Sequence, residues 1–190
     1  MVSETRPALR VDVRRPQRAD ARRNFDALLA AARDAFSTKG TEASLEDIAR
    51  QAGVGIGTLY RNFPTRQDLL RAVYLGEIEE LCLAAEDAAD LPPWEALFTW
   101  LRRFVAYAAT KRAIYESLNR ESDSFRISRE AMFAAGTPLF EQAQRSGDAR
   151  SDVNFDDVLR MVSGLTAAGY VDDAQRDRVL AIALDGIRNR

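Results

Sequence analysis

Apolar residues recur at steps of three and four along most of the chain, the spacing that places them on one face of an α-helix. The first such series follows Asp20 and ends at Lys39 and Gly40. A basic last turn followed by glycine is typical of a helix C-terminus. Shorter series over residues 45–52 and 56–63 predict two brief helices that meet at Gly53.

The same helical period continues through the second part of the chain. A long helix is predicted from Arg66 to about residue 90, before Pro92 and Pro93. Residues 112–125 predict a short helix and a loop, and Pro138 predicts a kink or a split in the helix around it. No segment alternates apolar and polar residues as a strand does. Further helices are expected from Pro93, from near Ser128, from Asn154 and around residues 179–187, which gives an all-α fold with eight to ten helices.

Composition limits the chemistry that the chain can perform. Its 190 residues include one cysteine, Cys82, and no histidine. These counts exclude an internal disulfide, a histidine-based catalytic triad and a histidine-ligated metal. Phosphate-binding and nucleophile motifs are also missing, so we expect no enzyme activity, no catalytic residues, no metal and no cofactor. Without an apolar run long enough for a membrane helix, the protein is expected to be cytoplasmic and to have no membrane partner.

Charge is distributed unevenly along the chain. Residues 1–66 hold 12 basic and 8 acidic side chains, a net charge of +4, whereas residues 67–190 hold 15 basic and 21 acidic ones, a net charge of −6. A basic first part indicates an anionic partner for that part alone. Residues 1–18 are predicted to be a flexible basic arm. The arm is either a solvated tail or a nucleic-acid arm, in which Arg14, Arg15 and Arg18 are candidates to enter a minor groove.

Residues 41–66 carry the pattern of a helix-turn-helix. Two short helices meet at Gly53, and Leu59 and Phe63 hold one face of the second helix inward. Thr58 and Arg61 project from the other face, where hydroxyl and guanidinium groups can contact phosphates and base edges. Ile56 shares the face of Leu59 and is expected to pack with it, and contact with a thymine methyl is the alternative. A nucleotide-binding glycine loop is disfavoured by the spacing, and an ordinary three-helix bundle remains an alternative.

The stretch A-x-x-A-G-V-x-x-G-T-L-Y-x-x-F over residues 49–63 resembles the DNA-binding domain of TetR-family transcriptional repressors, and the resemblance covers about residues 20–75. It implies a homodimer that binds double-stranded DNA at a palindromic operator. It also implies a helix-turn-helix domain over residues 19–66 and a ligand-binding and dimerisation domain over residues 67–190. By motif position, the expected DNA contacts are Ser44, Gly57, Thr58, Tyr60, Arg61, Asn62 and Arg66. Gly55 and Asn62 depart from the family, which often has serine, and histidine or tyrosine, at these positions.

Two C-terminal helices present apolar stripes suited to dimerisation, and the resemblance implies that they form a four-helix interface with their mates. The alternative is that these stripes complete the core of one chain. The candidate interface residues are Phe155, Val158, Leu159, Val162, Leu165, Val179, Ile182 and Ile187.

Aromatic residues gather on the predicted fifth helix and around Pro138, which favours a small-molecule pocket. The net charge of −6 predicts an apolar or aromatic effector that is not strongly anionic. The resemblance implies that this effector tilts the helix beginning near Arg66 and so releases DNA. The alternative is a ligand-independent DNA-binding or interaction protein whose aromatic residues are plain core. The candidate pocket residues are Trp100, Phe104, Tyr107, Tyr115, Phe133 and Phe140.

Overall fold

The computed structural model describes residues 15–114 and 123–189. Within these ranges the chain forms eight α-helices and one short 3-10 helix and no β-strand, which confirms the all-α prediction. The elements are α1 (Ala19–Lys39), η1 (Gly40–Glu42), α2 (Leu45–Gln51), α3 (Ile56–Asn62), α4 (Arg66–Asp87), α5 (Pro93–Ile114), α6 (Asp123–Arg145), α7 (Phe155–Thr166) and α8 (Asp173–Asp185).

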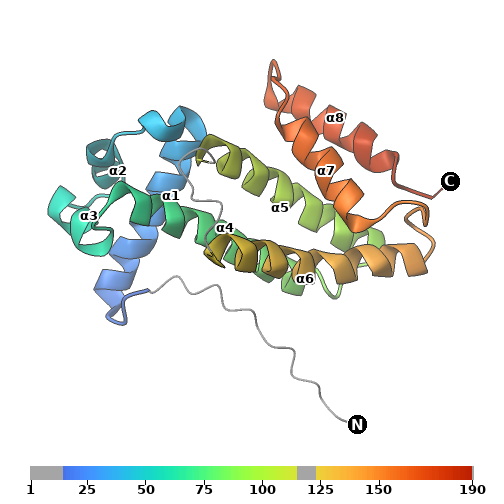
Figure 1. The fold of residues 1–190 in the computed structure, drawn as a ribbon, viewed down its shortest axis with the longest axis horizontal. Helices are drawn as coiled ribbons and strands as arrows, with labels where there is room; N and C mark the ends of the chain where they lie inside the picture. Colours follow the sequence, from blue (N-terminus) through green and yellow to red (C-terminus); the bar gives the residue numbers. More distant parts are fainter. Residues whose placement is uncertain (1–14, 115–122, 190) are drawn as a thin grey trace, which may run out of the picture.

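Helices α1, α2 and α3 lie at one end of the long axis, and α7 and α8 lie toward the other end (Figure 1). Two glycines set the turns between the first helices. Gly40 has φ 56° after α1, and Gly53 has φ 69° between α2 and α3. Both values fall in the left-handed region that side chains with a Cβ rarely adopt, so glycine is needed at both positions.

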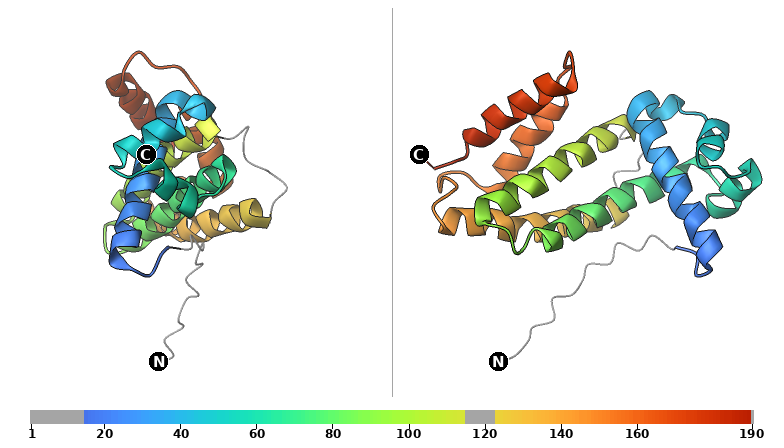
Figure 2. Two further views of the ribbon diagram at one scale, coloured as in Figure 1. Left: turned by 90° about the vertical axis from the view of Figure 1, so that its left-hand side faces the viewer. Right: turned by 180° about the vertical axis from the view of Figure 1, so that it is seen from behind.

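Helix α4 connects the two ends of the molecule. Its start is fixed by a capping box, in which the Thr65 hydroxyl accepts from the Asp68 amide at 3.1 Å and the Asp68 carboxylate accepts from the Thr65 amide at 3.0 Å. From there α4 packs along α5 and α6, and α1 crosses against both α4 and α5 (Figure 2). A displacement of α4 would therefore move the residues that it contacts at both ends of the molecule.

The predicted interruption at Pro138 is not a split, because α6 runs through it as one helix from Asp123 to Arg145. The start of α6 also lies before the expected start near Ser128. Packing of α6 on α4 and α5 offsets the hydrogen bond that proline cannot donate. The predicted short helix and loop over 112–125 largely fall outside the described residues, although α5 continues to Ile114.

Buried apolar side chains form one continuous cluster from the first helix to the last. Trp100 is fully buried near its centre, where its indole Nε1 donates to the Leu81 carbonyl at 3.0 Å. None of the helices in the described ranges is long and apolar enough to cross a bilayer.

Candidate functional site

Helix α3 has one face in the core and one face in solvent. Leu59 is fully buried, and the ring of Phe63 lies 4.9 Å from the ring of Phe25 on α1. Tyr60, in contrast, is 49% exposed, and Arg61 is exposed with no hydrogen bond or ion pair to any described residue. Ile56 was predicted to pack but is 38% exposed, because α3 turns its first residue away from the core. An exposed tyrosine, arginine and isoleucine on one short helix form a surface suited to a partner.

The turn before α3 leaves its backbone accessible. The Val54 amide donates to the Ala49 carbonyl at 3.0 Å and closes the turn that begins at Gly53. A Cβ added at Gly55 or Gly57 would meet no atom within 4 Å. These glycines are therefore not required by contacts within the chain, and they let another molecule approach the backbone at the start of α3.

Three other predicted DNA contacts are engaged within the chain. The Ser44 hydroxyl caps α2 by accepting from the Asp47 amide at 3.4 Å. The Asn62 amide donates to the Thr58 carbonyl at 2.8 Å. Arg66 donates to the Ala43 carbonyl at 2.7 Å, and its guanidinium lies 5.4 Å from the Phe36 ring centroid. Arg66 therefore joins the start of α4 to the helix-turn-helix.

The described end of the basic arm is held against the protein. Arg15 forms ion pairs with Asp26 on α1 at 3.2 Å and with Glu79 on α4 at 2.9 Å. Partial burial opposes the charge, but the hydrogen bond and attraction to Glu79 outweigh it and raise the pKa of Arg15. Arg14 lies outside the described residues, and Arg18 is exposed just before α1.

A buried carboxylate lies where α1, α4 and α5 meet. Glu77 on α4 is 1% exposed and forms ion pairs with Arg33 on α1 and with Arg103 on α5, the second at 3.1 Å. Sequence reasoning missed this cluster, although the helical period places Glu77 on the face of the buried Val73, Tyr74 and Leu81. Glu77 thus connects α1, which packs on the helix-turn-helix, to α4 and α5.

A hollow of about 610 Å³ lies between α5, α6 and α7, and we name it the α5–α6–α7 hollow. Of the predicted pocket residues, Phe104, Tyr107 and Phe133 line it. Trp100 and Phe140 do not line it, since both are buried in the core around Phe155. Tyr115 lies outside the described residues. The aromatic cluster is therefore divided between closed core and hollow, a division that helical spacing alone does not indicate.

Sequence reasoning missed the charged residues of this hollow, which include Lys111, Arg129, Asp156 and Arg160. A signal was nevertheless present. Lys111 follows Tyr107 by four residues and Arg129 precedes Phe133 by four, so each cation lies one helical turn from a predicted pocket aromatic.

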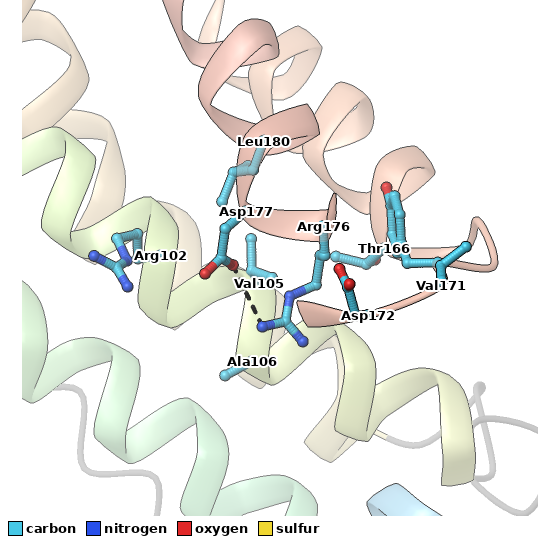
Figure 3. Close-up of a pocket in the computed structure, with 10 residues that line it drawn as sticks. Arg102, Val105, Ala106, Thr166, Val171, Asp172, Arg176, Asp177 and Leu180 are labelled. Carbon is cyan, nitrogen blue, oxygen red and sulfur yellow. Dashed lines mark hydrogen bonds and ion pairs between the residues drawn. The ribbon is translucent and has the colours of Figure 1, made fainter. Parts of the chain in front are cut away.

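A second hollow of about 560 Å³, the α5–α8 cleft, opens between α5, the end of α7 and the start of α8 (Figure 3). Its lining includes Arg102, Asp172, Arg176 and Asp177, and Arg176 pairs with Asp177 at 3.3 Å. Two arginines and two aspartates give these four residues no net charge.

The predicted dimer residues are divided by burial. Within a single chain, Leu165 and Val179 are half-buried and Ile182 is 72% exposed. The other five are already buried in the chain's own core: Phe155, Val158, Leu159, Val162 and Ile187. Of the predicted residues, those that remain available to a second copy therefore lie on the outer faces of α7 and α8.

Two family models match the chain. One, described as bacterial regulatory proteins of the tetR family, matches residues 28–73. The other, described as the C-terminal domain of SbtR-like transcriptional regulators, matches residues 92–189. Together they cover both the helix-turn-helix and the helices around the two hollows.

Solved structures and curated proteins agree with these matches. The TetR transcriptional regulator SCO0520 from Streptomyces coelicolor is 42% identical, with 86% of this chain and 98% of that chain covered and a TM-score of 0.75. A TetR transcription regulatory protein from Mycobacterium vanbaalenii is 33% identical, with 91% and 99% covered and a TM-score of 0.69.

The curated relatives are more distant. The transcriptional activator FasR of Mycolicibacterium smegmatis is 26% identical over 84% of this chain, and the transcriptional regulator SAR0097 of Staphylococcus aureus is 29% identical over 55% of it. The chain spans 66% and 56% of the lengths of these two proteins.

Proposed function

Because the chain belongs to the TetR family of transcriptional regulators, we propose that it is a sequence-specific DNA-binding protein that reads its operator with α3. The observation that carries this proposal is the exposed face of α3. Tyr60 is 49% exposed and Arg61 has no partner among the described residues, while Leu59 anchors the opposite face. A guanidinium free in this way is available for a bidentate contact with guanine in the major groove.

The other predicted contacts divide by their surroundings. Gly57 leaves room for a phosphate beside the backbone, and Tyr60 offers a hydroxyl that can donate to a phosphate. Arg66 acts from within the fold, because its hydrogen bond to Ala43 and its position over Phe36 orient α3 relative to α4. Ser44 caps α2, and Asn62 donates to a carbonyl within α3, so both stabilise their own helices. Any phosphate contact that they make is additional to that role.

The operator is proposed to be palindromic and bound by a homodimer. Two copies of α3 that read adjacent major grooves must lie about 34–36 Å apart, which requires a two-fold partner. The outer faces of α7 and α8 supply the apolar surface for this partner, with Ile182 as its most exposed large residue on α8.

The α5–α6–α7 hollow is proposed to hold an effector that releases the DNA, which makes the protein a repressor. Tyr107 of the hollow lies 6.2 Å from Tyr74 on α4 between ring centroids. Phe104 stacks on Trp100, which donates to Leu81 on α4. A ligand that prefers a displaced α4 would shift Arg66 and with it α3.

Selection of bound duplexes from a random library, followed by fluorescence anisotropy with Arg61→Ala, tests the reading role of α3. The variant is expected to lose about 1–3 kcal/mol on the selected operator and to relax preference at one position per half-site. Arg145→Ala removes the same charge from the exposed end of α6 and is the matched control, with unchanged operator preference. Unchanged operator selection by Arg61→Ala would contradict the proposal.

Arg66→Ala separates positioning from reading. The variant is expected to bind all duplexes more weakly, with a salt slope lower by about one per subunit if Arg66 also contacts a phosphate. It should also lose about 1–3 kcal/mol of unfolding free energy, because a charge-assisted hydrogen bond is removed. Arg61→Ala should leave stability unchanged in the same denaturant titration. A change of base preference in Arg66→Ala would argue against a positioning role.

A further inference from the structure

We propose that the α5–α6–α7 hollow binds an amphipathic organic anion, a molecule with one acidic group on an aromatic or aliphatic body. This inference rests on the proposed effector role of the hollow and names the chemical class of the effector. The body would contact the apolar wall formed by Phe104, Met132 and Leu159. The acidic group would lie at the cationic side chains that border this wall.

The local charge of the hollow is opposite to that of its domain. Its described lining includes three cations, Lys111, Arg129 and Arg160, and one carboxylate, Asp156. Asp156 is shared, since it pairs with Arg129 at 3.2 Å and also with Arg160. Counted together, these four side chains carry a formal charge of +2. The net charge of −6 over residues 67–190 therefore does not describe this lining, in which Asp156 is the one acidic residue among the described ones.

Two of the cations lie against aromatic rings of the hollow. The Arg129 guanidinium is 4.5 Å from the Phe133 ring centroid, and the Lys111 ammonium is 5.7 Å from that of Tyr107. Cations placed beside apolar surface are partly removed from water, which strengthens their attraction to an anion that also contacts that surface. This juxtaposition suits one molecule with both characters better than a free inorganic anion.

Size and the neighbouring cleft support the same ligand class. A hollow of about 610 Å³ falls in the range that encloses a small organic molecule, roughly 300–1,000 Å³. Ser163 also lies in its lining, and its hydroxyl can donate to an acidic group, whereas the Thr166 hydroxyl already donates to the Ser163 carbonyl at 2.8 Å. The α5–α8 cleft of similar size lacks the charge excess, since Arg102 and Arg176 are balanced there by two aspartates.

Two dyes that differ by one sulfonate provide the test. The anionic 1-anilinonaphthalene-8-sulfonate and the neutral N-phenyl-1-naphthylamine are titrated against the full-length protein, and fluorescence gives both dissociation constants. The anionic dye is expected to bind at least about tenfold more tightly than the neutral one. Lys111→Gln and Arg129→Gln should each weaken the anionic dye about three- to tenfold and leave the neutral dye unchanged.

Two further variants locate the binding. Arg126→Gln removes a cation one turn before Arg129 on the same helix but outside the hollow, and it should leave both affinities unchanged. Ser163→Phe introduces a ring into the hollow and should weaken both dyes. Equal affinities for the two dyes, binding of neither dye, or binding insensitive to Ser163→Phe would each overturn the proposal.

Operator release is measured separately by anisotropy on a selected duplex. A dye that binds with this charge dependence but leaves the DNA bound would sustain the ligand class and refute effector release. Arg61→Ala is expected to lose operator recognition and to bind both dyes as the wild type does. That result would show that DNA reading by α3 and ligand binding in the hollow can be tested separately.

Discussion

At the residue scale, a single glycine decides how tightly α6 approaches its neighbours. A Cβ built on Gly136 would lie 2.4 Å from Cζ of Phe155 and 2.6 Å from Cη2 of Trp100. Such distances are far inside van der Waals contact, so only glycine admits these two rings. Gly136 and Pro138 together predict a break in the helix, yet their context is an unbroken helix pressed against an aromatic core.

Gly136→Ala is therefore expected to lower the unfolding free energy by about 1–3 kcal/mol, because two buried rings must move. Urea denaturation followed by circular dichroism measures the change. Gly76→Ala is the matched control within α4, where an added Cβ meets nothing within 4 Å. The control should raise stability by up to about 1 kcal/mol through helix propensity. Equal effects of the two substitutions would contradict the close approach at Gly136.

At the element scale, α4 is joined to both ends of the molecule by charged contacts. Thr65 caps its start, Arg66 binds that start to the helix-turn-helix, and Glu77 ties its middle to α1 and α5. A buried carboxylate between two arginines holds these helices in one register, since any shift that separates the charges leaves them poorly solvated.

Glu77→Gln is expected to cost about 2–4 kcal/mol of unfolding free energy. The substitution keeps the shape of the side chain but removes the buried carboxylate that lies between Arg33 and Arg103. Glu80→Gln is the control, because Glu80 is half exposed and lies 3.9 Å from Arg103. That change should stay within about 0.5 kcal/mol. Stability equal to that of the control would show that the Glu77 cluster contributes little.

At the scale of the whole molecule, part of the apolar surface left by the single chain lies on the outer faces of α7 and α8. Met161 and Leu165 lie one turn apart on α7, and Val179 and Ile182 occupy one side of α8. Gly164 is exposed between them, and a small residue lets another helix come close. These positions sit at the end of the molecule away from α3, so a dimer formed there would leave both copies of α3 uncovered (Figure 1).

Ile182→Lys is expected to convert the proposed dimer to a monomer of 21.2 kDa, because a charge replaces an apolar side chain that is 72% exposed in the single chain. Light scattering after size exclusion measures the mass. Leu83→Lys is the control, since Leu83 is 49% exposed on α4 and belongs to neither proposed dimer helix. A dimeric Ile182→Lys, or a monomeric wild type, would refute this interface.

The sequence alone determined the helix-turn-helix and most of the helices, although not the unbroken course of α6 through Pro138. Helical periodicity, Gly40, Gly53 and the motif over residues 49–63 act through neighbours along the chain, so their effect can be read without knowing the fold. The same local reasoning identified Leu59 as buried and Arg61 as outward-facing.

Only the tertiary structure decided which faces meet. Helical spacing indicates an apolar stripe on α7 but not whether its own chain or a second copy covers it; packing buries Val158 and Val162 inside one chain. Tertiary packing likewise closed the core around Trp100. It left Tyr107 at the α5–α6–α7 hollow and brought Arg129 and Lys111 to the same hollow. Glu77 became buried for the same reason, since its partners come from two other helices. These contacts join residues far apart in the sequence, and the local pattern of neither partner contains the other.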